Sequence, residues 1–491
     1  PACCTVSPQA VKQRSIYISL HNSWQRGNKR FICCRRSHSP HSSRSDYRQC
    51  SAPGWVFIIP ASTTTNVQRS GRRCCHPYEI IIGVRSSLFL PFQQLGLVIV
   101  DEEHESSYKQ QDPAPRYHAR DAAVMLAHFF GAKTLLGSAT PSIESYYNSQ
   151  TGKYGLVTLT ERFNNSMMPE IRLENTRELR RRKKMKSLLS PLLIELIDSA
   201  LKNDEQAILF RNRRGFAPMI ACSQCEWTPK CVRCDVSLTY HKRINRLVCH
   251  YCNNAYTVPA TCPSCHQKSL EPMGLGTEKL EEEVSRLFPG SVVKRMDLDS
   301  TRGKESYARI IQDFQEQKIQ ILVGTQMLSK GLDFDHVKVV GIISADSLLN
   351  YPDFRSHERG FQLMTQAAGR AGRKQQQGTV IIQSADPGHP IYTFVTKNDY
   401  AGFYNTQLEE RKLFRYPPFY RLIRILCKHK DAGKTNQDVF ARTGSGTQQT
   451  PCGTHTTVPH SRNFIETGEW TTLTAGTRDP EKSRSHAAPG T

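Results

Sequence analysis

The sequence predicts an α/β protein built from two parallel-sheet lobes, with a small cysteine-rich insert in the second lobe. Two observations lead to this prediction. Residues 79–430 alternate short apolar runs with stretches of helical spacing, which is the pattern of a parallel sheet flanked by helices. Within them, eight of the 17 cysteines lie between Cys222 and Cys265, all in C-x2-C pairs. A chain of 491 residues is long enough for three or more domains.

The individual elements follow from local patterns. Short apolar runs predict strands at Glu79–Val84, Leu95–Val100 and Thr134–Leu136. Helical spacing predicts helices over Tyr117–Phe130 and Ser187–Leu201. Between these elements, Arg177–Lys186 reads R-E-L-R-R-R-K-K-M-K. We interpret this basic run as a solvated tether between domains rather than as a DNA contact.

The two ends of the chain differ in composition from the middle. Residues 1–78 are rich in Cys, Ser, Arg and Pro, and they carry 12 basic residues against one acidic residue. Residues 431–491 are rich in Thr, Gly, Ser and Pro. We expect neither end to fold. Because residues 79–430 keep a net charge of only +11 out of the total of +22, the charge favours an anionic partner weakly.

Hydropathy argues against a membrane protein. No apolar stretch approaches the roughly 20 residues that a membrane span needs. The first residues contain no apolar segment of the kind found in a signal peptide. We therefore expect a cytoplasmic protein with no membrane partner.

The cysteine pairs predict two zinc sites in residues 222–265. Zinc binds four thiolates in a tetrahedron, and one C-x2-C turn offers two of them. A metal-binding module in a reduced compartment fits this usage better than a disulfide scaffold does. We treat the nearby histidines as bystanders, because eight thiols already complete two Cys4 sites. The cysteines are Cys222, Cys225, Cys231, Cys234, Cys249, Cys252, Cys262 and Cys265.

The sequence leaves the pairing of these four turns open. Cys225 and Cys231 are close in the chain, so one site that used both neighbouring turns would be cramped. An arrangement of the first turn with the fourth, and of the second with the third, is sterically easier.

Two strands of the first lobe are each followed directly by a motif of catalytic type. The apolar strand at Leu95–Val100 runs into D-E-E-H, in which Asp101 would hold a magnesium ion and Glu102 would polarise the attacking water. A second apolar strand runs into Ser138-Ala139-Thr140. S-A-T in this place is the motif that couples the ATP and nucleic-acid sites in superfamily-two helicases.

The second lobe carries two further motifs. Ile321–Asp333 reads I-L-V-G-T-Q-M-L-S-K-G-L-D, and Gln366–Arg373 reads Q-A-A-G-R-A-G-R on a helix expected after Ser356. At this spacing Arg370 and Arg373 can reach the γ-phosphate of a nucleotide held by the other lobe.

In this order, the motifs resemble those of the primosomal protein N′ family, the replication-restart DNA helicases called PriA. The resemblance covers roughly residues 79–430 and includes F-R-N-R-R-G-F at Phe210–Phe216, directly before the cysteine insert, and G-L-G-T-E at Gly274–Glu278. It implies RecA-like lobes and a 3′→5′ DNA helicase that uses ATP and Mg²⁺. It also implies recognition of stalled or collapsed forks and the start of primosome assembly in the bacterial nucleoid.

The resemblance further implies partners and site residues. The partners are forked and single-stranded DNA, primosome and restart proteins, and single-stranded DNA-binding protein. The implied zinc pairing is Cys222, Cys225, Cys262 and Cys265 on one ion, and Cys231, Cys234, Cys249 and Cys252 on the other. His104 and Gln366 join the catalytic set. The implied DNA-binding residues are Tyr108, Lys109, Arg116, Tyr117, His118, Thr325, Gln326 and Lys330, of which the first five mix stacking faces with phosphate donors.

The sequence lacks the loop that should hold the nucleotide phosphates. No G-x4-G-K-[ST] motif precedes D-E-E-H. Codons can be written for Cys33–Ser43 that give L-P-E-I-A-L-T-P-Q-L when read two bases later, which resembles the family's segment just after that loop. We therefore expect roughly residues 20–75, and the tail after about residue 435, to be translated out of frame, and the chain to be catalytically impaired.

These inferences predict a definite domain organisation. One alternative to a helicase is a non-catalytic zinc module that binds fork DNA or a restart partner protein. Another is a structural protein that does not depend on DNA and uses zinc only to fold. The expected segments are 1–78 (aberrant), 79–160 (remainder of the first lobe), 161–187 (basic linker), 188–221 and 266–385 (second lobe), 222–265 (zinc module), 386–430 (start of a C-terminal domain) and 431–491 (aberrant tail).

Overall fold

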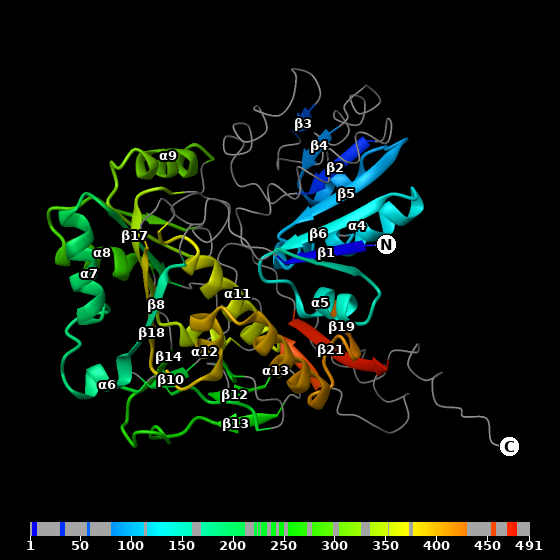
Figure 1. Ribbon diagram of the computed structural model, residues 1–491. Coiled ribbons are helices and arrows are strands. Elements are labelled where there is room, and N and C mark those ends of the chain that lie inside the picture. The colour runs from blue at the N-terminus through cyan, green and yellow to red at the C-terminus, as the bar shows by residue number, and fades with distance from the viewer. Residues whose placement is uncertain are drawn as a thin grey trace.

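The computed structural model describes most of residues 80–429, together with five strands outside that range. These are β1 (Ala2–Val6), β2 (Arg30–Cys34), β3 (Val56–Ile58), β20 (Gly453–Thr457) and β21 (Glu469–Arg478). Within 80–429 the description omits 112–114, 160–167, 212–219, 223, 226, 233–236, 242–244, 250–253, 273–276, 298–303, 326–333, 352 and 373–376. The described parts form two lobes with a small antiparallel insert below the second (Figure 1).

The first lobe is a parallel sheet in the order β3-β4-β2-β5-β6-β1-β7. Its later strands are β4 (Ile80–Gly83), β5 (Leu95–Asp101), β6 (Lys133–Ser138) and β7 (Gly155–Thr158). The three strands predicted from apolar runs are thereby confirmed. The expectation that neither end of the chain folds was wrong for the five strands outside residues 80–429, because their backbones find partners in a sheet. In the first lobe, β1 pairs with β6, β2 with β5 and β3 with β4. In the tail, β21 pairs with β20 and with a strand at residues 420–429.

Burial explains why β5 stands in the middle of this sheet. Its residues 97–100 are all buried, as a continuous apolar run in a two-sided parallel sheet should be. Helix α4 (Ala119–Phe129) covers it and buries three alanines at four-residue spacing, Ala119, Ala123 and Ala127, so the helix approaches closely. Two short 3-10 helices, η1 (Arg85–Phe89) and η2 (Ser106–Tyr108), and helix α5 (Ile143–Gln150) complete this lobe.

The second lobe is also a parallel sheet, in the order β15-β16-β9-β17-β18-β8. Alternate residues of the inner strand β9 (Gln206–Arg211) face opposite sides of the sheet. Ala207 and Leu209 pack with helices α7 and α8, whereas Ile208 and Phe210 pack with α9 and α11. The bounds are β8 (Glu170–Asn175), β9 (Gln206–Arg211), β15 (Val293–Met296), β16 (Ile321–Gly324), β17 (Val337–Ile343), β18 (Thr379–Ser384), α7 (Pro191–Lys202), α8 (Thr277–Leu287), α9 (Lys304–Gln315), α10 (Asp346–Leu349) and α11 (Ser356–Ala368).

The segment expected to be a basic linker contains regular structure. Residues 170–175 form β8, the edge strand of the second sheet, paired with β18 over its whole length. Helix α6 (Thr176–Arg181) follows, with the Asn175 side chain accepting a hydrogen bond from the backbone N–H of Glu178. The interpretation of Arg177–Lys186 as a free tether was therefore wrong for its first half, because this half continues a strand and helix of the second lobe.

The cysteine-rich insert lies where the sequence predicts it. At its two ends, β10 (Ile220–Cys222) pairs antiparallel with β14 (Leu270–Pro272). Inside it, β11 (Thr239–His241), β12 (Arg246–Val248) and β13 (Ala255–Thr257) form a small antiparallel sheet. The first pair closes the insert at its base, so the chain enters and leaves the second lobe at one place (Figure 1).

The residues after the second sheet pack back onto both lobes. Helices α12 (Pro390–Lys397) and α13 (Tyr400–Leu413) place Tyr392, Val395 and Phe403 in the core of the second lobe. Ile143 of the first lobe lies in the same apolar cluster. Strand β19 (Tyr420–His429) then pairs with β21. The segment expected to begin a separate domain is thus joined to the second lobe by an apolar core.

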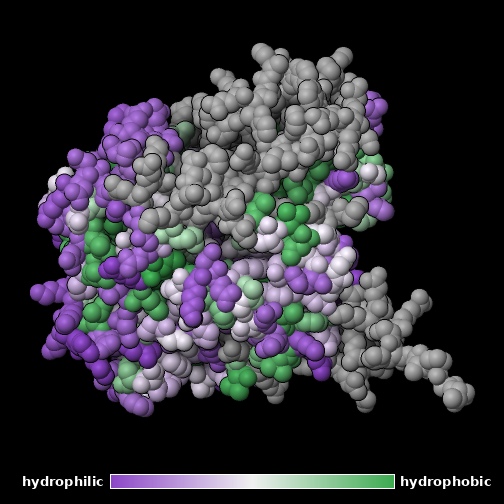
Figure 2. Space-filling view, viewed as in Figure 1, coloured by the Kyte–Doolittle hydropathy of each residue, from purple (hydrophilic) through white to green (hydrophobic). Residues whose placement is uncertain are grey.

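The outer surface of the second lobe around α8 and α9 is mainly hydrophilic (Figure 2). Over the part of the chain that the structure describes, no helix combines the length and the apolar character that crossing a membrane requires.

Gly378 allows a close backbone approach that any other residue would disturb. A Cβ at this position would lie 2.5 Å from the carbonyl carbon of Ala371 and 2.5 Å from the nitrogen of Gly372. We expect Gly378→Ala to lower the free energy of unfolding by about 1–3 kcal/mol or more, measured by urea denaturation. Gly290→Ala is the control, because a Cβ there meets no atom within 4 Å. Equal stability of the two variants would contradict this account.

Candidate functional site

The D-E-E-H motif begins where β5 ends. Asp101 is the last residue of the strand, and Glu102 adopts a left-handed backbone with φ of 51°. A non-glycine residue in this region is uncommon, and such residues often lie at functional sites. The backbone N–H of Glu103 donates to the carbonyl of Gly137 over 3.1 Å, so the motif is joined directly to the end of β6 and the S-A-T motif.

His104 connects three of the predicted motifs. Its Nδ1 lies 2.6 Å from the Ser138 hydroxyl, and its Nε2 lies 2.7 Å from the amide nitrogen of Gln366 on α11. Because an amide nitrogen can only donate, Nε2 accepts and Nδ1–H donates to Ser138. The Ser138 hydroxyl also accepts from the backbone N–H of Thr140 over 3.1 Å. D-E-E-H, S-A-T and Q-A-A-G-R-A-G-R therefore meet across the two lobes.

Glu103, which the motif analysis did not single out, is the anchor of this region. Its side chain is 0% exposed and accepts hydrogen bonds from Arg120 at 3.0 Å and from the Ser145 hydroxyl at 2.8 Å. The backbone N–H of Ser142 donates to it at 2.6 Å. Burial raises the pKa of this carboxyl, but Arg120 and these donors outweigh burial and hold the pKa below its usual range.

A further group of charged residues at the lobe boundary was missed by the sequence analysis. Glu144 on α5 binds Arg355 at 2.6 Å and Arg411 at 3.0 Å, and Arg411 also binds Glu358 at 2.7 Å. Arg355 and Glu358 belong to the second lobe. No local pattern marks these residues, because the partners lie up to 267 positions apart in the chain.

The predicted DNA-binding loop is a hairpin that exposes some of its residues. The backbone N–H of Gln110 donates to the carbonyl of Tyr117, and Lys109 pairs with His118. Lys109 and Arg116 are exposed, and Tyr117 is half-buried against the ring of Phe89, with centroids 4.9 Å apart. Phe89 is itself 58% exposed, an aromatic face that the sequence analysis did not include.

The prediction that Tyr108 offers a stacking face was wrong. Its side chain is 2% exposed and lies in the core of the first lobe. Its hydroxyl donates to the backbone carbonyl of Asp101. The residue therefore braces the end of β5, because an aromatic residue with one polar atom can be buried when that atom finds a partner.

The remaining predicted residues of the second lobe are only partly described. Thr325 follows β16 and is buried, and Arg370 follows α11 with 3% of its surface exposed. Ala139 lies between Ser138 and Thr140 at the end of β6. Gln326, Lys330 and Arg373 lie outside the described residues, so their predicted roles remain predictions.

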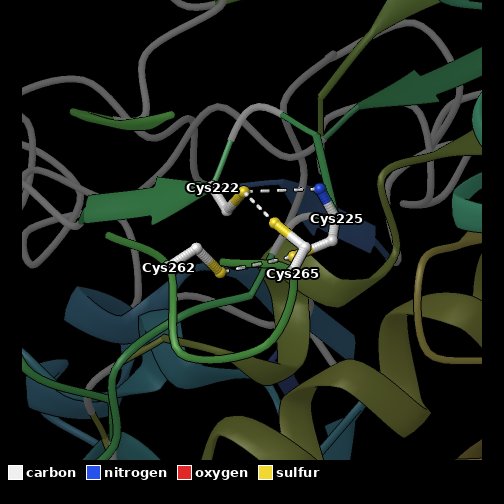
Figure 3. Close-up of side chains that lie close together, drawn as sticks. All are labelled: Cys222, Cys225, Cys262 and Cys265. Atoms are coloured by element: carbon white, nitrogen blue, oxygen red, sulfur yellow. Dashed lines mark hydrogen bonds between the residues drawn. The ribbon is translucent and has the colours of Figure 1, made fainter. Parts of the chain in front are cut away.

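Four cysteines form a cluster that fits a metal ion. The sulfurs of Cys222, Cys225, Cys262 and Cys265 all lie within 4.8 Å of one another and point toward a common centre (Figure 3). Cys222 lies 3.4 Å from Cys265 and Cys225 lies 3.5 Å from Cys262, measured between sulfurs. A tetrahedral zinc with bonds of about 2.3 Å separates its sulfurs by about 3.8 Å, so this donor set suits zinc. The first turn lies beside the fourth, as their predicted pairing requires, and their sharing of one zinc stays a prediction.

Hydrogen bonds around the cluster favour a thiolate at Cys222. Burial raises the pKa of this thiol, but donors such as the Ser269 hydroxyl, 3.0 Å from the sulfur, outweigh burial and lower the pKa to about 6. Zinc binds the thiolate form, so Ser269 prepares one ligand. Burial raises the pKa of the Cys225 thiol to about 12, so that ligand would release its proton on binding metal.

The second predicted zinc site is described in half. Cys231 and Cys249 are buried in one apolar cluster with Ile220, Leu238 and Leu247. Cys234 and Cys252 lie outside the described residues. The proximity of the second and third turns is consistent with a shared site, and the assignment of these four cysteines to a second zinc stays a prediction.

Comparison with known proteins places these features in a family. Residues 231–255 match the family model "PriA DNA helicase Cys-rich region (CRR) domain", and residues 276–375 match "Helicase conserved C-terminal domain". The chain is 42% identical over 381 residues to replication restart protein PriA of Bacillus subtilis, covering 77% of this chain and 47% of that protein.

Two further relatives give the same result. The PriA protein of Haemophilus influenzae is 44% identical over 357 residues, covering 72% of this chain and 48% of the relative. That of Treponema pallidum is 39% identical over 395 residues, covering 80% and 59%. The chain thus spans about half the length of most of the relatives it matches.

Loss of one cysteine from the described cluster should remove one metal ion. We expect Cys262→Ser to lower the zinc content by about one ion per chain, because three thiolates hold zinc far more weakly than four. Inductively coupled plasma mass spectrometry of the purified protein measures this. Cys427→Ser, outside any C-x2-C pair, is the control. Unchanged zinc in Cys262→Ser would show that this cluster holds no metal.

His118 should make the stability of the fold depend on pH. Burial and the Arg120 guanidinium lower its pKa to about 4 in the folded chain, against about 6.5 when unfolded. Below pH 6.5 the unfolded chain binds a proton that the folded chain does not, so stability falls between pH 6.5 and 4. We expect His118→Gln to reduce this fall by about 1–3 kcal/mol in urea titrations. If the free energy of unfolding of the parent and of His118→Gln fell in parallel from pH 7 to pH 4, this account of His118 would be contradicted.

Proposed function

Because the aligned part of this chain belongs to the PriA family of replication restart proteins, we propose that it derives from an ATP-dependent 3′→5′ DNA helicase. Such an enzyme would recognise stalled or collapsed forks and initiate primosome assembly. The contact of His104 with Ser138 and Gln366 carries this proposal. It joins the D-E-E-H motif, the coupling motif and the second lobe in one hydrogen-bonded chain, as a motor driven by interlobe movement requires.

Forked and single-stranded DNA are the proposed substrates. Lys109 and Arg116 offer exposed cations, and Phe89 with Tyr117 offers aromatic surface beside them. This combination suits a strand whose phosphates and unstacked bases must both be held. The proposed protein partners, namely primosome and restart proteins and single-stranded DNA-binding protein, rest on the family alone. So does the proposed cytoplasmic, nucleoid-associated location.

We also propose that this chain is catalytically impaired. Mg²⁺–ATP would supply the phosphoryl group whose hydrolysis drives movement, and Asp101 and Glu102 are the residues that would face it. The phosphate-binding loop is the part of the sequence that does not fit, since no G-x4-G-K-[ST] motif precedes Asp101. Without that loop, little in the chain retains the nucleotide phosphates.

A second candidate function follows from the zinc cluster. Its four-thiol ligand set is complete, whereas the phosphate-binding half of the ATP site is not. The insert could therefore bind fork DNA or a restart partner protein independently of ATP. This candidate is distinguished by binding that survives Asp101→Asn but is lost with Cys262→Ser.

ATP turnover gives the first test. We expect DNA-stimulated phosphate release by this chain to be at the background rate, and to be unchanged by Asp101→Asn, because an activity that is absent cannot be lowered further. A coupled spectrophotometric assay with forked DNA measures it. A DNA-stimulated rate well above that of Asp101→Asn would show that the chain is an active ATPase and would refute the proposed impairment.

DNA binding gives the second test. We expect the double variant Lys109→Ala and Arg116→Ala to bind fluorescent single-stranded DNA more weakly. The magnitude of the slope of log affinity against log salt concentration should fall by about 1–2. Each lost cation leaves one phosphate that the protein no longer neutralises, so fewer counterions are released from the DNA on binding. Lys202→Ala on α7, equally cationic and exposed, is the control. An unchanged slope would exclude this hairpin as a phosphate-contacting surface.

A further inference from the structure

Four charged side chains meet where helix α5 of the first lobe contacts α11 and α13. We call Glu144, Arg355, Glu358 and Arg411 the interlobe charge cluster. Arg411 is the central member, because its charged side chain is only 1% exposed. A buried guanidinium needs anionic partners on more than one of its faces, and these partners come from different lobes.

Glu144 makes the ion pairs that cross the lobe boundary, because it is the member of the cluster that belongs to the first lobe. One terminal nitrogen of Arg411 lies 3.0 Å from Glu144, and the other lies 2.7 Å from Glu358. Arg355 binds the same two carboxylates, at 2.6 Å to Glu144 and 3.1 Å to Glu358. Two carboxylates and two guanidiniums thus alternate, and their charges cancel. Because each ion binds both opposite ions, removing one leaves buried charge unpaired.

Further hydrogen bonds and ring contacts surround the cluster at the same boundary. The backbone N–H of Ile143 donates to Glu358 over 2.9 Å, and the Tyr400 hydroxyl donates to the Pro141 carbonyl over 2.9 Å. The ring of Tyr146 on α5 makes edge contacts with the rings of Tyr400 and Tyr404 on α13, with centroids 5.1 and 4.7 Å apart. Helix α13 therefore holds α5 by polar and apolar contacts together.

The cluster lies next to the residues that join the motifs. Glu144 is on the helix that directly follows the S-A-T segment, and Glu358 is on the helix that carries Gln362 and Gln366. Gln362 reaches the carbonyl of Thr140 at 3.4 Å, and Gln366 reaches His104. A shift of α5 against α11 would thus move the coupling motif away from its second-lobe partners.

We propose that Glu144, Glu358 and Arg411 are positioning residues that hold α5, α11 and α13 as one unit across the lobe boundary. Without nucleotide or DNA, this unit then keeps the two lobes in one relative arrangement instead of letting them separate. The proposal rests on the proposed helicase function for its purpose, but not for its test. It assigns to α13, which follows the helicase lobes in the chain, the role of closing their contact.

The test measures the distance between the lobes without nucleotide or DNA. Nitroxide labels are attached at Met125 on α4 and at Leu287 on α8, whose side chains are both exposed. Each label is coupled to a keto amino acid introduced at that position, because the 17 cysteines of the chain rule out labelling through thiols. Double electron–electron resonance then gives the distance distribution. We expect one narrow distance distribution for the parent chain. In Arg411→Met, which keeps much of the side-chain volume but removes the charge, we expect the distribution to broaden or its mean to shift.

Two controls make the result decisive. Arg172→Met removes an exposed guanidinium paired with Glu170 inside the second lobe, and should leave the distribution unchanged. Glu144→Gln, which keeps the shape of the side chain, should broaden it, and replaces Arg411→Met if circular dichroism shows that variant to be unfolded. A folded Arg411→Met or Glu144→Gln with the parent distribution would overturn the proposal. Since the measurement needs no ATP or DNA, it stands even if the helicase assignment fails.

Discussion

Three carboxylates, those of Glu103, Glu144 and Glu358, are buried or largely buried where the two lobes meet. The other groups at this contact neutralise their charge or donate hydrogen bonds to them. Removing a charge from water costs several kcal/mol unless a partner replaces the lost hydration. Glu103 has Arg120 and serine donors, whereas Glu144 and Glu358 share Arg355 and Arg411. The backbone N–H groups of Ser142 and Ile143, at the start of α5, supply the remaining donors. The beginning of α5 is therefore the point at which both lobes are held.

The motif residues depend on this arrangement. Ser138 and Thr140 lie in the short segment from the end of β6 to the start of α5, and His104 follows Glu103 directly. Fixing α5 and Glu103 therefore also fixes the groups that meet Gln366. The zinc cluster is separate from this network and is built from local turns.

Much of the fold, but only part of the site, could be predicted from the sequence. The run at Leu95–Val100 predicts a strand correctly because a parallel sheet covered on both faces makes its inner strands apolar throughout. The C-x2-C turns predict a metal cluster, but the sequence alone left open which turns meet, and only the family resemblance implied the grouping of Cys222 with Cys265. The edge strand Glu170–Asn175 was missed because its polar alternation resembles a linker. Tyr108 was misassigned because an aromatic residue in a polar loop gives no sign of its burial. Arg411 and Glu144 could not be found, because their contact arises only from the tertiary fold.

Hydrogen exchange at the start of α5 tests the central claim most directly. The N–H of Ser142 donates to Glu103 within its own lobe, whereas that of the next residue, Ile143, donates to Glu358 of the other lobe. Mass spectrometry with residue-level fragmentation can compare the two amides without nucleotide. If the lobes are held together as described, both amides exchange slowly and at similar rates. Fast exchange at Ile143 beside a protected Ser142 would show that the lobes separate freely and would contradict the account.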